Sequence, residues 1–306
     1  MPEPTKELTR FDVEAWITTM ATGRFHYTKV LDGQVKSSSY GKLRKIMHDI
    51  VKKGNICEPE GKNDGWYRPI QAEPELVEWQ DIPARQSFPV ELPFDLRKWV
   101  FIYPNTVIVV AGSKSSGKTG FILRTVVMNM KNVTPVLLTN LEGGREQLRD
   151  RLYAMDIEIP NPAPFKVIQA SENYHDFITQ RNTLYAIDYI DVPESGEFYL
   201  IAGQIKKIAR KLTDGDLHSV AVIGLQKPMS RKFAYGGEQT LKDAALYIAL
   251  DNKKLQIVDA KAATDPKVDP STFKNMAWTF HYQDSGTKFT DIQPFHDINN
   301  PDDIPF

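Results

Sequence analysis

The stretch GSKSSGKT, residues 112–119, decides the fold. It follows the apolar, β-branched run TVIVVA (106–111) and opens an uninterrupted helical pattern over 118–130. These eight residues fit G-x-x-x-x-G-K-[ST], in which glycines let backbone N–H groups wrap closely around phosphates. A strand before the loop and a helix after it put the free N–H groups of the helix start at those phosphates. A chance Ser/Gly turn is the weaker interpretation in this context.

The loop predicts a nucleoside triphosphate site that uses ATP and Mg²⁺. Lys118 is expected to reach the β- and γ-phosphates, and the Thr119 hydroxyl is expected to contact Mg²⁺. The residues expected to surround the nucleotide are Gly112, Ser113, Lys114, Ser115, Ser116, Gly117, Lys118, Thr119 and Gly120.

Length and composition indicate a globular chain. Its 306 residues predict about two domains, and 41% hydrophobic residues suffice for a sizeable core. The chain lacks an 18-residue apolar run, and its start lacks the apolar centre of a signal peptide, so a cytoplasmic protein without membrane insertion is expected. A single cysteine, Cys57, excludes an intramolecular disulfide and disfavours a thiolate zinc site. Because the net charge is −1, any polyanion must bind to a local basic patch.

The central part of the chain alternates strand and helix patterns. Near-continuous apolar strands are typical of a parallel sheet that is buried on both faces. The expected class is therefore α/β with a mainly parallel sheet, and its chemistry should lie at the carboxyl ends of the strands. Further strands are expected at 135–141, 165–170, 183–188 and 219–225, and helical patterns at 144–155 and 198–212.

Polar side chains follow three of these strands. Asp188 is a candidate second contact to Mg²⁺, Glu142 a candidate base for an attacking water, and Gln226 a third polar strand end. For each residue alone the functional interpretation is weak, because an acidic residue after a strand is more often a helix cap or a solvated loop residue. Their order behind the phosphate loop makes the set specific.

These segments resemble the RecA-like P-loop ATPases, which include recombinases, DnaB-type replicative helicases and KaiC-like proteins. The resemblance covers roughly residues 94–290 and is greatest to the DnaB type around LLTNLEGGREQLRDRL and LYAIDYID. It implies that Lys118 and Thr119 hold phosphate and Mg²⁺, with Asp188 behind the metal ion. It also implies Glu142 as catalytic base and Gln226 as a sensor between the γ-phosphate and a DNA-binding loop.

One position departs from the DnaB pattern. The matching strand in that group carries a lysine and then an arginine that act on the nucleotide of a neighbouring subunit. Here Lys261 is present as the expected subunit-interface residue, but Ala263 stands where the arginine is expected. Since an arginine finger is worth a factor of about 10³ or more, fast hydrolysis and processive unwinding are in doubt. The resemblance also implies a homo-oligomer, either a ring or a filament.

The segment KPMSRKFAYGGE after Gln226 has the composition of a strand-gripping loop. Cations neutralise phosphates and aromatic faces stack on bases, so the segment favours single-stranded DNA binding. A solvated basic loop with an aromatic residue in the core is the alternative. The DNA-binding candidates of this loop are Lys227, Arg231, Lys232, Phe233 and Tyr235.

Residues 1–70 predict a small α+β winged-helix domain. Helical patterns at 10–23 and 37–54, a short strand at 24–31 and a hairpin at 55–70 occur in the winged-helix order. The second helix would present its basic side to duplex DNA. Winged helices also dock proteins, and a lysine-rich face is often only solvated, so both alternatives stay open. The DNA-binding candidates are Lys42, Arg44, Lys45 and Lys52.

Two further segments complete the predicted organisation. Residues 71–93, rich in proline and acidic residues, are expected to form a linker. Residues 291–306 are expected to form an acidic tail whose end resembles the tip of bacterial single-stranded-DNA-binding proteins. That resemblance implies docking to the partners of those proteins, or else a tail that covers the protein's own basic loop. The tip residues are Asp302, Asp303, Ile304, Pro305 and Phe306.

The combined prediction is an ATP-hydrolysing protein that acts on single-stranded DNA in bacterial or phage replication or recombination. Hydrolysis is expected to be slow without DNA or an oligomer. Two alternatives remain at this point. One is a hexameric DNA helicase motor, and the other is a non-enzymatic regulator or mediator gated by nucleotide.

Overall fold

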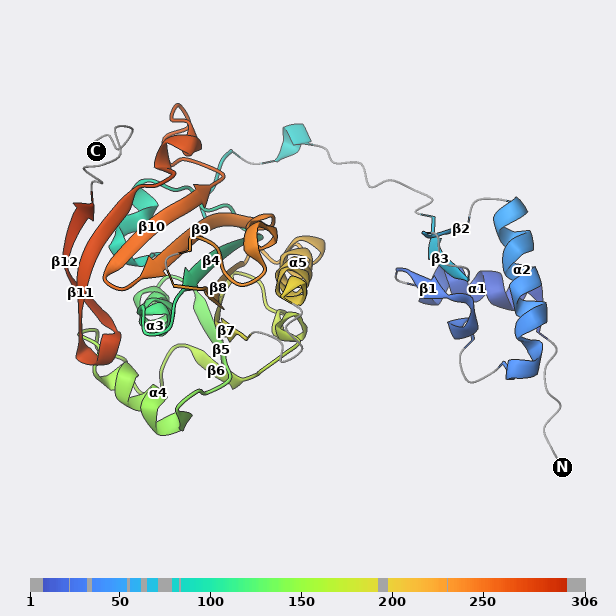
Figure 1. Cartoon of the computed structure of the whole chain (residues 1–306), viewed down its shortest axis with the longest axis horizontal. Helices are drawn as coiled ribbons and strands as arrows, with labels where there is room; N and C mark the ends of the chain where they lie inside the picture. Colours follow the sequence, from blue (N-terminus) through green and yellow to red (C-terminus); the bar gives the residue numbers. More distant parts are fainter. Residues whose placement is uncertain are drawn as a thin grey trace. The chain divides into compact units, whose positions relative to one another are not determined.

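The computed structural model describes residues 8–21, 23–31, 35–53, 56–61, 65–70, 79–82, 84–191, 198–229 and 231–295. The chain divides into two compact units, Met1–Ile82 and Pro83–Phe306 (Figure 1). Within the described ranges, every helix is too short or too polar to cross a membrane.

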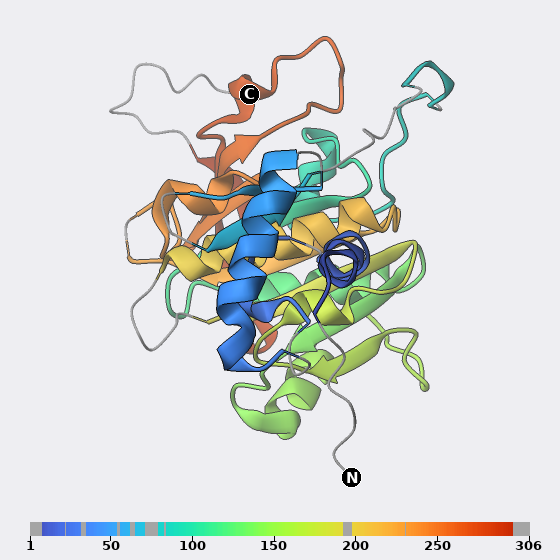
Figure 2. The ribbon, with the colours of Figure 1, turned by 90° about the vertical axis from the view of Figure 1, so that its right-hand side faces the viewer.

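The first unit packs two helices against a three-stranded antiparallel sheet. Helix α1 (Arg10–Met20) starts at a capping box between Thr9 and Asp12, and α2 (Tyr40–Lys53) follows. Strands β1 (Phe25–His26), β2 (Cys57–Pro59) and β3 (Trp66–Pro69) form the order β1-β3-β2. Figure 2 shows α1 nearly end-on and α2 along its length, so the two helices cross steeply.

The strand predicted over 24–31 is much shorter than expected. Only Phe25 and His26 pair with β3, because the chain turns into a 3₁₀ helix at Tyr27–Lys29. The apolar positions at helical spacing in α2 do face the core of this unit. The buried core residues are Val13, Ile17, Phe25, Val30, Leu43, Met47, Ile50, Cys57 and Tyr67.

The second unit contains a nine-stranded sheet, β12-β11-β10-β9-β4-β8-β7-β5-β6. The pairs from β9 to β6 are parallel, whereas β9-β10, β10-β11 and β11-β12 are antiparallel. The predicted α/β class with a mainly parallel sheet is confirmed. The strands are β4 (Thr106–Gly112), β5 (Thr134–Thr139), β6 (Lys166–Gln169), β7 (Thr183–Ile190), β8 (Val220–Gln226), β9 (Ala244–Asp251), β10 (Lys254–Ala260), β11 (Ala277–Gln283) and β12 (Lys288–Phe295).

Helices cover both faces of this sheet. Helix α3 (Lys118–Asn129) packs on the face that contains Ile108 and Val110, while α5 (Tyr199–Asp214) packs on the face of Val107 and Val109. The two helices therefore lie on opposite sides of β4, as Figure 1 shows. Because β4 is buried on both sides, its sequence is continuously apolar rather than alternating. The third helix of this unit, α4 (Gly144–Tyr153), has no buried residue.

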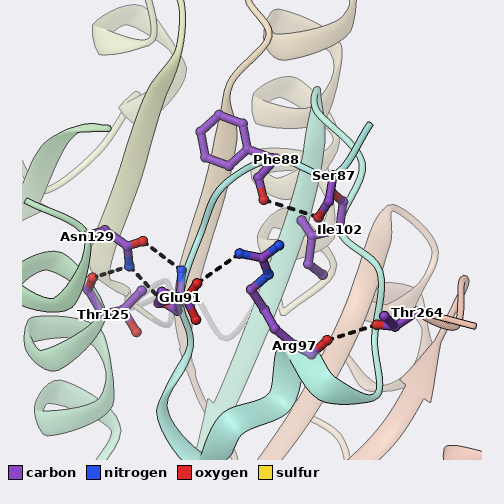
Figure 3. A network of polar contacts seen from close by, with 8 residues as sticks. All are labelled: Ser87, Phe88, Glu91, Arg97, Ile102, Thr125, Asn129 and Thr264. Atoms are coloured by element: carbon purple, nitrogen blue, oxygen red, sulfur yellow. Dashed lines mark hydrogen bonds and ion pairs between the residues drawn. The ribbon is translucent and has the colours of Figure 1, made fainter. Parts of the chain in front are cut away.

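Part of the predicted linker belongs to the second unit. Phe88, Val90 and Leu92 are buried in the same core as α3. Asn129 of α3 accepts from Glu91 N and donates to Glu91 O, both at 2.7 Å, and Arg97 pairs with the Glu91 carboxylate at 2.9 Å (Figure 3). The predicted boundary at residue 94 is therefore too late.

The acidic tail also starts later than predicted. Strand β12 continues to Phe295, paired with β11, so residues 291–295 are part of the sheet. The segment Asp302–Phe306 lies outside the described residues.

Candidate nucleotide-binding site

The phosphate loop connects β4 to α3 in a conformation that requires its glycines. Gly117 is the residue before α3 and has a φ of 91°, in the left-handed region where a Cβ is strained. At Gly112, a Cβ would lie 2.5 Å from the Ser116 Oγ. The glycines therefore allow a tight loop directly beneath the first turn of the helix.

The loop leaves hydrogen-bonding groups available for an anion. No side chain caps the N-terminus of α3, so the N–H groups of its first turn have no capping partner from the described residues. The Ser116 Oγ is buried and, in the described part of the chain, has no hydrogen-bond partner. An uncapped helix start with an orphaned hydroxyl suits a phosphate group.

A cavity of about 800 Å³ opens above this loop. It is bounded by the carboxyl ends of β4, β5, β7 and β8, which lie side by side in the sheet. The structure thereby brings together all five side chains that the sequence singled out for phosphate, metal and water: Lys118, Thr119, Glu142, Asp188 and Gln226.

Lys118 and Asp188 carry opposite charges and line the same cavity. The Thr119 Oγ1 donates to the Asp188 Oδ1 at 3.2 Å, and the Lys118 Nζ lies 4.0 Å from the centre of the Tyr189 ring. Burial lowers the pKa of Lys118, an effect that the Asp188 and Glu142 carboxylates oppose. Burial raises the pKa of Asp188, while Lys118 and Thr119 act in the opposite direction. Burial therefore works against the charge of both groups, and a bound metal ion and phosphates would offset that cost.

Replacing Asp188 by asparagine is expected to stabilise the nucleotide-free protein near neutral pH. Because the folded-state pKa of Asp188 is raised, wild-type stability falls as pH rises from the usual carboxylate pKa through the raised value. Urea unfolding without nucleotide should show that Asp188→Asn raises the free energy of unfolding above that of wild type. This increase should be larger at pH 7 than at pH 4. Exposed Asp150→Asn is the control. An equal or smaller gain at pH 7 would contradict the proposed cost of burying this carboxylate.

Glu142 enters the cavity from the loop after β5. The loop is shaped by Asn140, whose Oδ1 accepts from Glu142 N at 3.1 Å, and by the positive φ of Leu141. The Glu142 side chain is exposed and hydrogen-bonds to Tyr189. Burial, with the carboxylates of Asp191 and Glu142, raises the pKa of Tyr189 to about 12, so the phenol stays protonated at neutral pH. Exposure keeps the Glu142 carboxylate accessible to water.

Sequence reasoning missed the contribution of α4. One side of this helix, with Gln147, Leu148 and Arg151, lines the cavity, and the charge of Arg151 acts to lower the pKa of Asp188. The i, i+1, i+4 spacing of these three residues could have indicated a shared helix side. Arg151 thus adds a second cation to the lining of the cavity.

The C-terminal hairpin supplies the remaining wall. The Tyr282 hydroxyl donates to the Ser116 carbonyl oxygen, and a Cβ at Gly117 would lie 2.4 Å from the Tyr282 ring. A Cβ at Gly120 would lie 1.8 Å from the Gly286 carbonyl oxygen. Gly120, within the predicted nucleotide-binding set, is therefore required for packing of the hairpin. No local sequence pattern indicates contacts across more than 160 residues.

The loop after Gln226 differs from the predicted exposed basic loop. Lys227 is 2% exposed, and its Nζ donates to the Asp251 Oδ1 at 2.5 Å and the Arg231 carbonyl oxygen at 2.6 Å. Its ammonium therefore anchors the base of the loop and does not face solvent. Of the predicted cations, Arg231 and Lys232 are exposed.

The two aromatic residues of this loop are also held by the protein. Phe233 packs edge-on against Tyr247 at 6.0 Å, and Tyr235 stacks on Phe198 at 5.1 Å. Both pack against the core on the α5 side of the sheet. The alternative from the sequence was a solvated basic loop with one aromatic residue in the core; the structure packs both Phe233 and Tyr235 against the core, and DNA binding by this loop stays a prediction.

The other candidates are described within their own units, and Lys261 is not among the described residues that line the cavity. Lys42, Arg44, Lys45 and Lys52 are exposed on α2 of the first unit. The Lys261 Nζ donates to the Lys242 carbonyl oxygen at 3.0 Å. Ala263 is 3% exposed, and its carbonyl oxygen accepts from the Arg85 guanidinium.

Comparisons with known proteins found similar solved structures but no matching sequence. No family model matches the chain. No curated protein sequence matches it either. One similar solved structure is a DnaB-like replicative helicase, described with its interactions with primase; it is 12% identical, with a TM-score of 0.46 over 67% of this chain and 64% of that one. Another is a KaiC-like protein from the hyperthermophilic archaeon Pyrococcus horikoshii OT3, 15% identical, with a TM-score of 0.46 over 67% of this chain and 100% of that one.

The chain thus spans slightly less than two thirds of the length of the matched helicase. Because one fold can host many activities, the function of this chain has to be derived from its own site.

Proposed function

We propose that this protein is a Mg²⁺-dependent ATPase that couples ATP to its hold on single-stranded DNA in replication or recombination. The observation that carries the proposal is the shared cavity of Lys118, Thr119, Asp188, Glu142 and Gln226. The uncapped start of α3 and the orphaned Ser116 hydroxyl support phosphate at the floor of that cavity.

The residues of the cavity divide the chemistry among them. Backbone N–H groups of the phosphate loop and Lys118 hold the β- and γ-phosphates. Thr119 and Asp188 would hold Mg²⁺, which when bound neutralises charge on the phosphates. Glu142 orients a water molecule and accepts a proton from it. The water oxygen forms a bond to the γ-phosphorus, and the bond between that phosphorus and the β–γ bridging oxygen breaks. The products are ADP and inorganic phosphate.

Arg151 gives the site a cation from its own chain. A cation is needed because negative charge on the transferring group must be stabilised in the transition state. Ala263 offers none. Arg151 lines the cavity and is expected to face the γ-phosphate. This arrangement supports slow hydrolysis by a clamp or mediator and disfavours a fast helicase motor.

Gln226 provides the proposed link between nucleotide and DNA. Its side chain lines the cavity, and its carbonyl oxygen accepts from Tyr235 N at 3.0 Å, closing the following loop. Loss of the γ-phosphate can therefore change the positions of Arg231 and Lys232, the exposed cations of that loop. The first unit is proposed to be a winged helix whose exposed α2 cations contact duplex DNA, with protein docking as the alternative.

Single-stranded DNA is expected to raise the ATPase rate at least several-fold, because occupancy of the loop favours the competent position of Gln226. Phosphate release should be measured with and without an oligonucleotide, with Glu142→Gln as the blank for contaminating activity. An unchanged rate would favour the nucleotide-gated regulator, and displacement of a strand from a forked substrate would favour the motor.

The segment Asp302–Phe306 is proposed to recruit proteins that bind the tip of single-stranded-DNA-binding protein. The support is its sequence, two acidic residues followed by Ile-Pro-Phe. Its deletion should abolish capture of purified tip-binding proteins without changing ATPase activity. Undiminished capture by the shortened chain would remove this part of the proposal.

A further inference from the structure

Helix α5 presents an unusually one-sided charge distribution. Its buried side consists of Ile201, Ile205, Ile208 and Leu212, which pack on the sheet. Its exposed side carries four cations within six residues and a single acid, Asp214, at the end of the helix. The four cations, here called the α5 basic face, are Lys206, Lys207, Arg210 and Lys211.

The cations of the α5 basic face have no charged partner among the residues that the structure describes. No ion pair or hydrogen bond joins any of the four side chains to another described group. Two acidic residues lie on elements that pack against α5. Asp176 belongs to the 3₁₀ helix Tyr174–Phe177 and pairs with the neighbouring His175. Glu238 belongs to the 3₁₀ helix Gly237–Leu241. The α5 basic face is therefore a local excess of positive charge on a nearly neutral chain.

The charges of helix α4 are distributed differently from those of α5. Its exposed residues mix both signs, and Arg149 pairs with Asp150 at 3.0 Å. Mixed signs keep a surface helix soluble without attracting a polyanion. The α5 basic face lacks that balance, although the two helices belong to the same unit.

Helix α5 packs against the loop after Gln226 and against the segment that follows it. Phe198, directly before α5, stacks on Tyr235 with ring centres 5.1 Å apart and an angle of 17° between the rings. Helix α5 also contacts the 3₁₀ helix Gly237–Leu241 that follows the loop. The exposed cations Arg231 and Lys232 of the loop thus belong to a segment that packs against the same helix.

We propose that the α5 basic face binds the sugar–phosphate backbone of single-stranded DNA and extends the contact made by the loop after Gln226. The four long side chains leave one side of a helix, so they can contact consecutive phosphates without rearrangement of the backbone that carries them. The face has no exposed aromatic residue between Lys206 and Lys211, so its contribution is independent of base sequence. Single strands are favoured over duplex as the partner because the proposed function places this protein on single-stranded DNA, whereas Phe233 and Tyr235 stay packed against Tyr247 and Phe198.

This inference rests on the proposed DNA role but not on hydrolysis. Its test is the salt dependence of binding between the full-length protein and a fluorescent oligothymidylate, with ATP analogue and Mg²⁺ present. The test variant is Lys206→Ala, Lys207→Ala, Arg210→Ala and Lys211→Ala combined, and alanine favours the helix. The control variant removes four exposed lysines elsewhere in the same unit: Lys98, Lys131, Lys166 and Lys267, each to Ala.

The slope of log K against log[salt] should become shallower by about 2 to 3 in the α5 variant, because each phosphate contact on a single strand contributes about 0.7. The control variant should keep the wild-type slope, and both variants should bind ATP analogue as wild type does. Equal slopes for the α5 variant and wild type overturn the inference, even if wild type binds DNA and the proposed function stands. The inference is also overturned if the α5 variant changes the slope for duplex DNA but not for the oligothymidylate. If the wild-type protein does not bind the ATP analogue, it is the proposed function that fails.

Discussion

Replacing Lys118 by alanine is expected to abolish detectable ATP binding. The ammonium lies in the cavity over the Tyr189 ring, next to the Asp188 carboxylate, and in the bound state it would pair with the phosphates. Hydrogen bonds to charged groups are worth about 1.5 to 3 kcal/mol each, so the loss of more than one such contact weakens binding by a factor of about 100 or more. Titration calorimetry of the full chain with an ATP analogue and Mg²⁺ measures this directly.

Lys131→Ala is the matched control for Lys118→Ala. Lys131 lies just beyond the other end of α3 and is exposed, so this variant loses the same charge outside the cavity. It should bind the analogue as wild type does. Equal affinities for wild type and Lys118→Ala, with both proteins folded by circular dichroism, would remove the phosphate site from this loop.

Replacing Glu142 by glutamine is expected to lower kcat by about 10² to 10⁴, because general base catalysis contributes a factor of this size. ATP binding should persist, since glutamine keeps the shape of the side chain and removes a negative charge close to the phosphates. The variant should therefore hold ATP on the protein without turning it over. Single-turnover phosphate release, measured together with nucleotide affinity, separates the two effects.

Glu146→Gln controls for the loss of a carboxylate from the same region. Glu146 lies in the first turn of α4, is exposed and does not line the cavity, so its replacement should leave kcat within about twofold, as is usual for surface substitutions. If Glu142→Gln hydrolyses ATP at the wild-type rate, the catalytic base is a different group.

The sequence was sufficient for the centre of the sheet because local patterns specify it. The apolar run before Gly112 and the helical pattern after Gly117 predicted β4 and α3 to within a residue or two. Strand ends were enough to group Glu142, Asp188 and Gln226, since parallel strands place their carboxyl ends at one edge. Their roles in catalysis stay predictions.

The remaining parts of the site depend on contacts that no local pattern encodes. Tyr282 reaches the phosphate loop only because β11 and β12 extend the sheet beyond β10. The burial of Lys227 depends on Asp251 at the end of β9, 24 residues along the chain. The basic and aromatic composition of the segment predicted a DNA-binding role for Lys227, whereas its ion pair with Asp251 keeps its side chain buried.

The end of the predicted linker was misplaced for a related reason. Proline and acidic residues around Phe88 and Glu91 lack helical or strand periodicity, which is typical of a linker. The segment is nevertheless fixed by hydrogen bonds with Asn129 and by burial of Phe88, Val90 and Leu92, a short apolar alternation that the surrounding prolines and acidic residues obscure. Irregular segments of this kind are stabilised by long-range contacts, which sequence patterns of 10 to 20 residues do not contain.

The most direct test of the central claim is a structure of the full chain with a non-hydrolysable ATP analogue and Mg²⁺. We expect the triphosphate to lie against the start of α3, with Lys118 on the β- and γ-phosphates and the metal ion held by Thr119 and Asp188. Glu142 and Arg151 should face the γ-phosphate. Nucleotide bound elsewhere, or a cavity above the phosphate loop that stays empty at saturating analogue, would contradict this assignment.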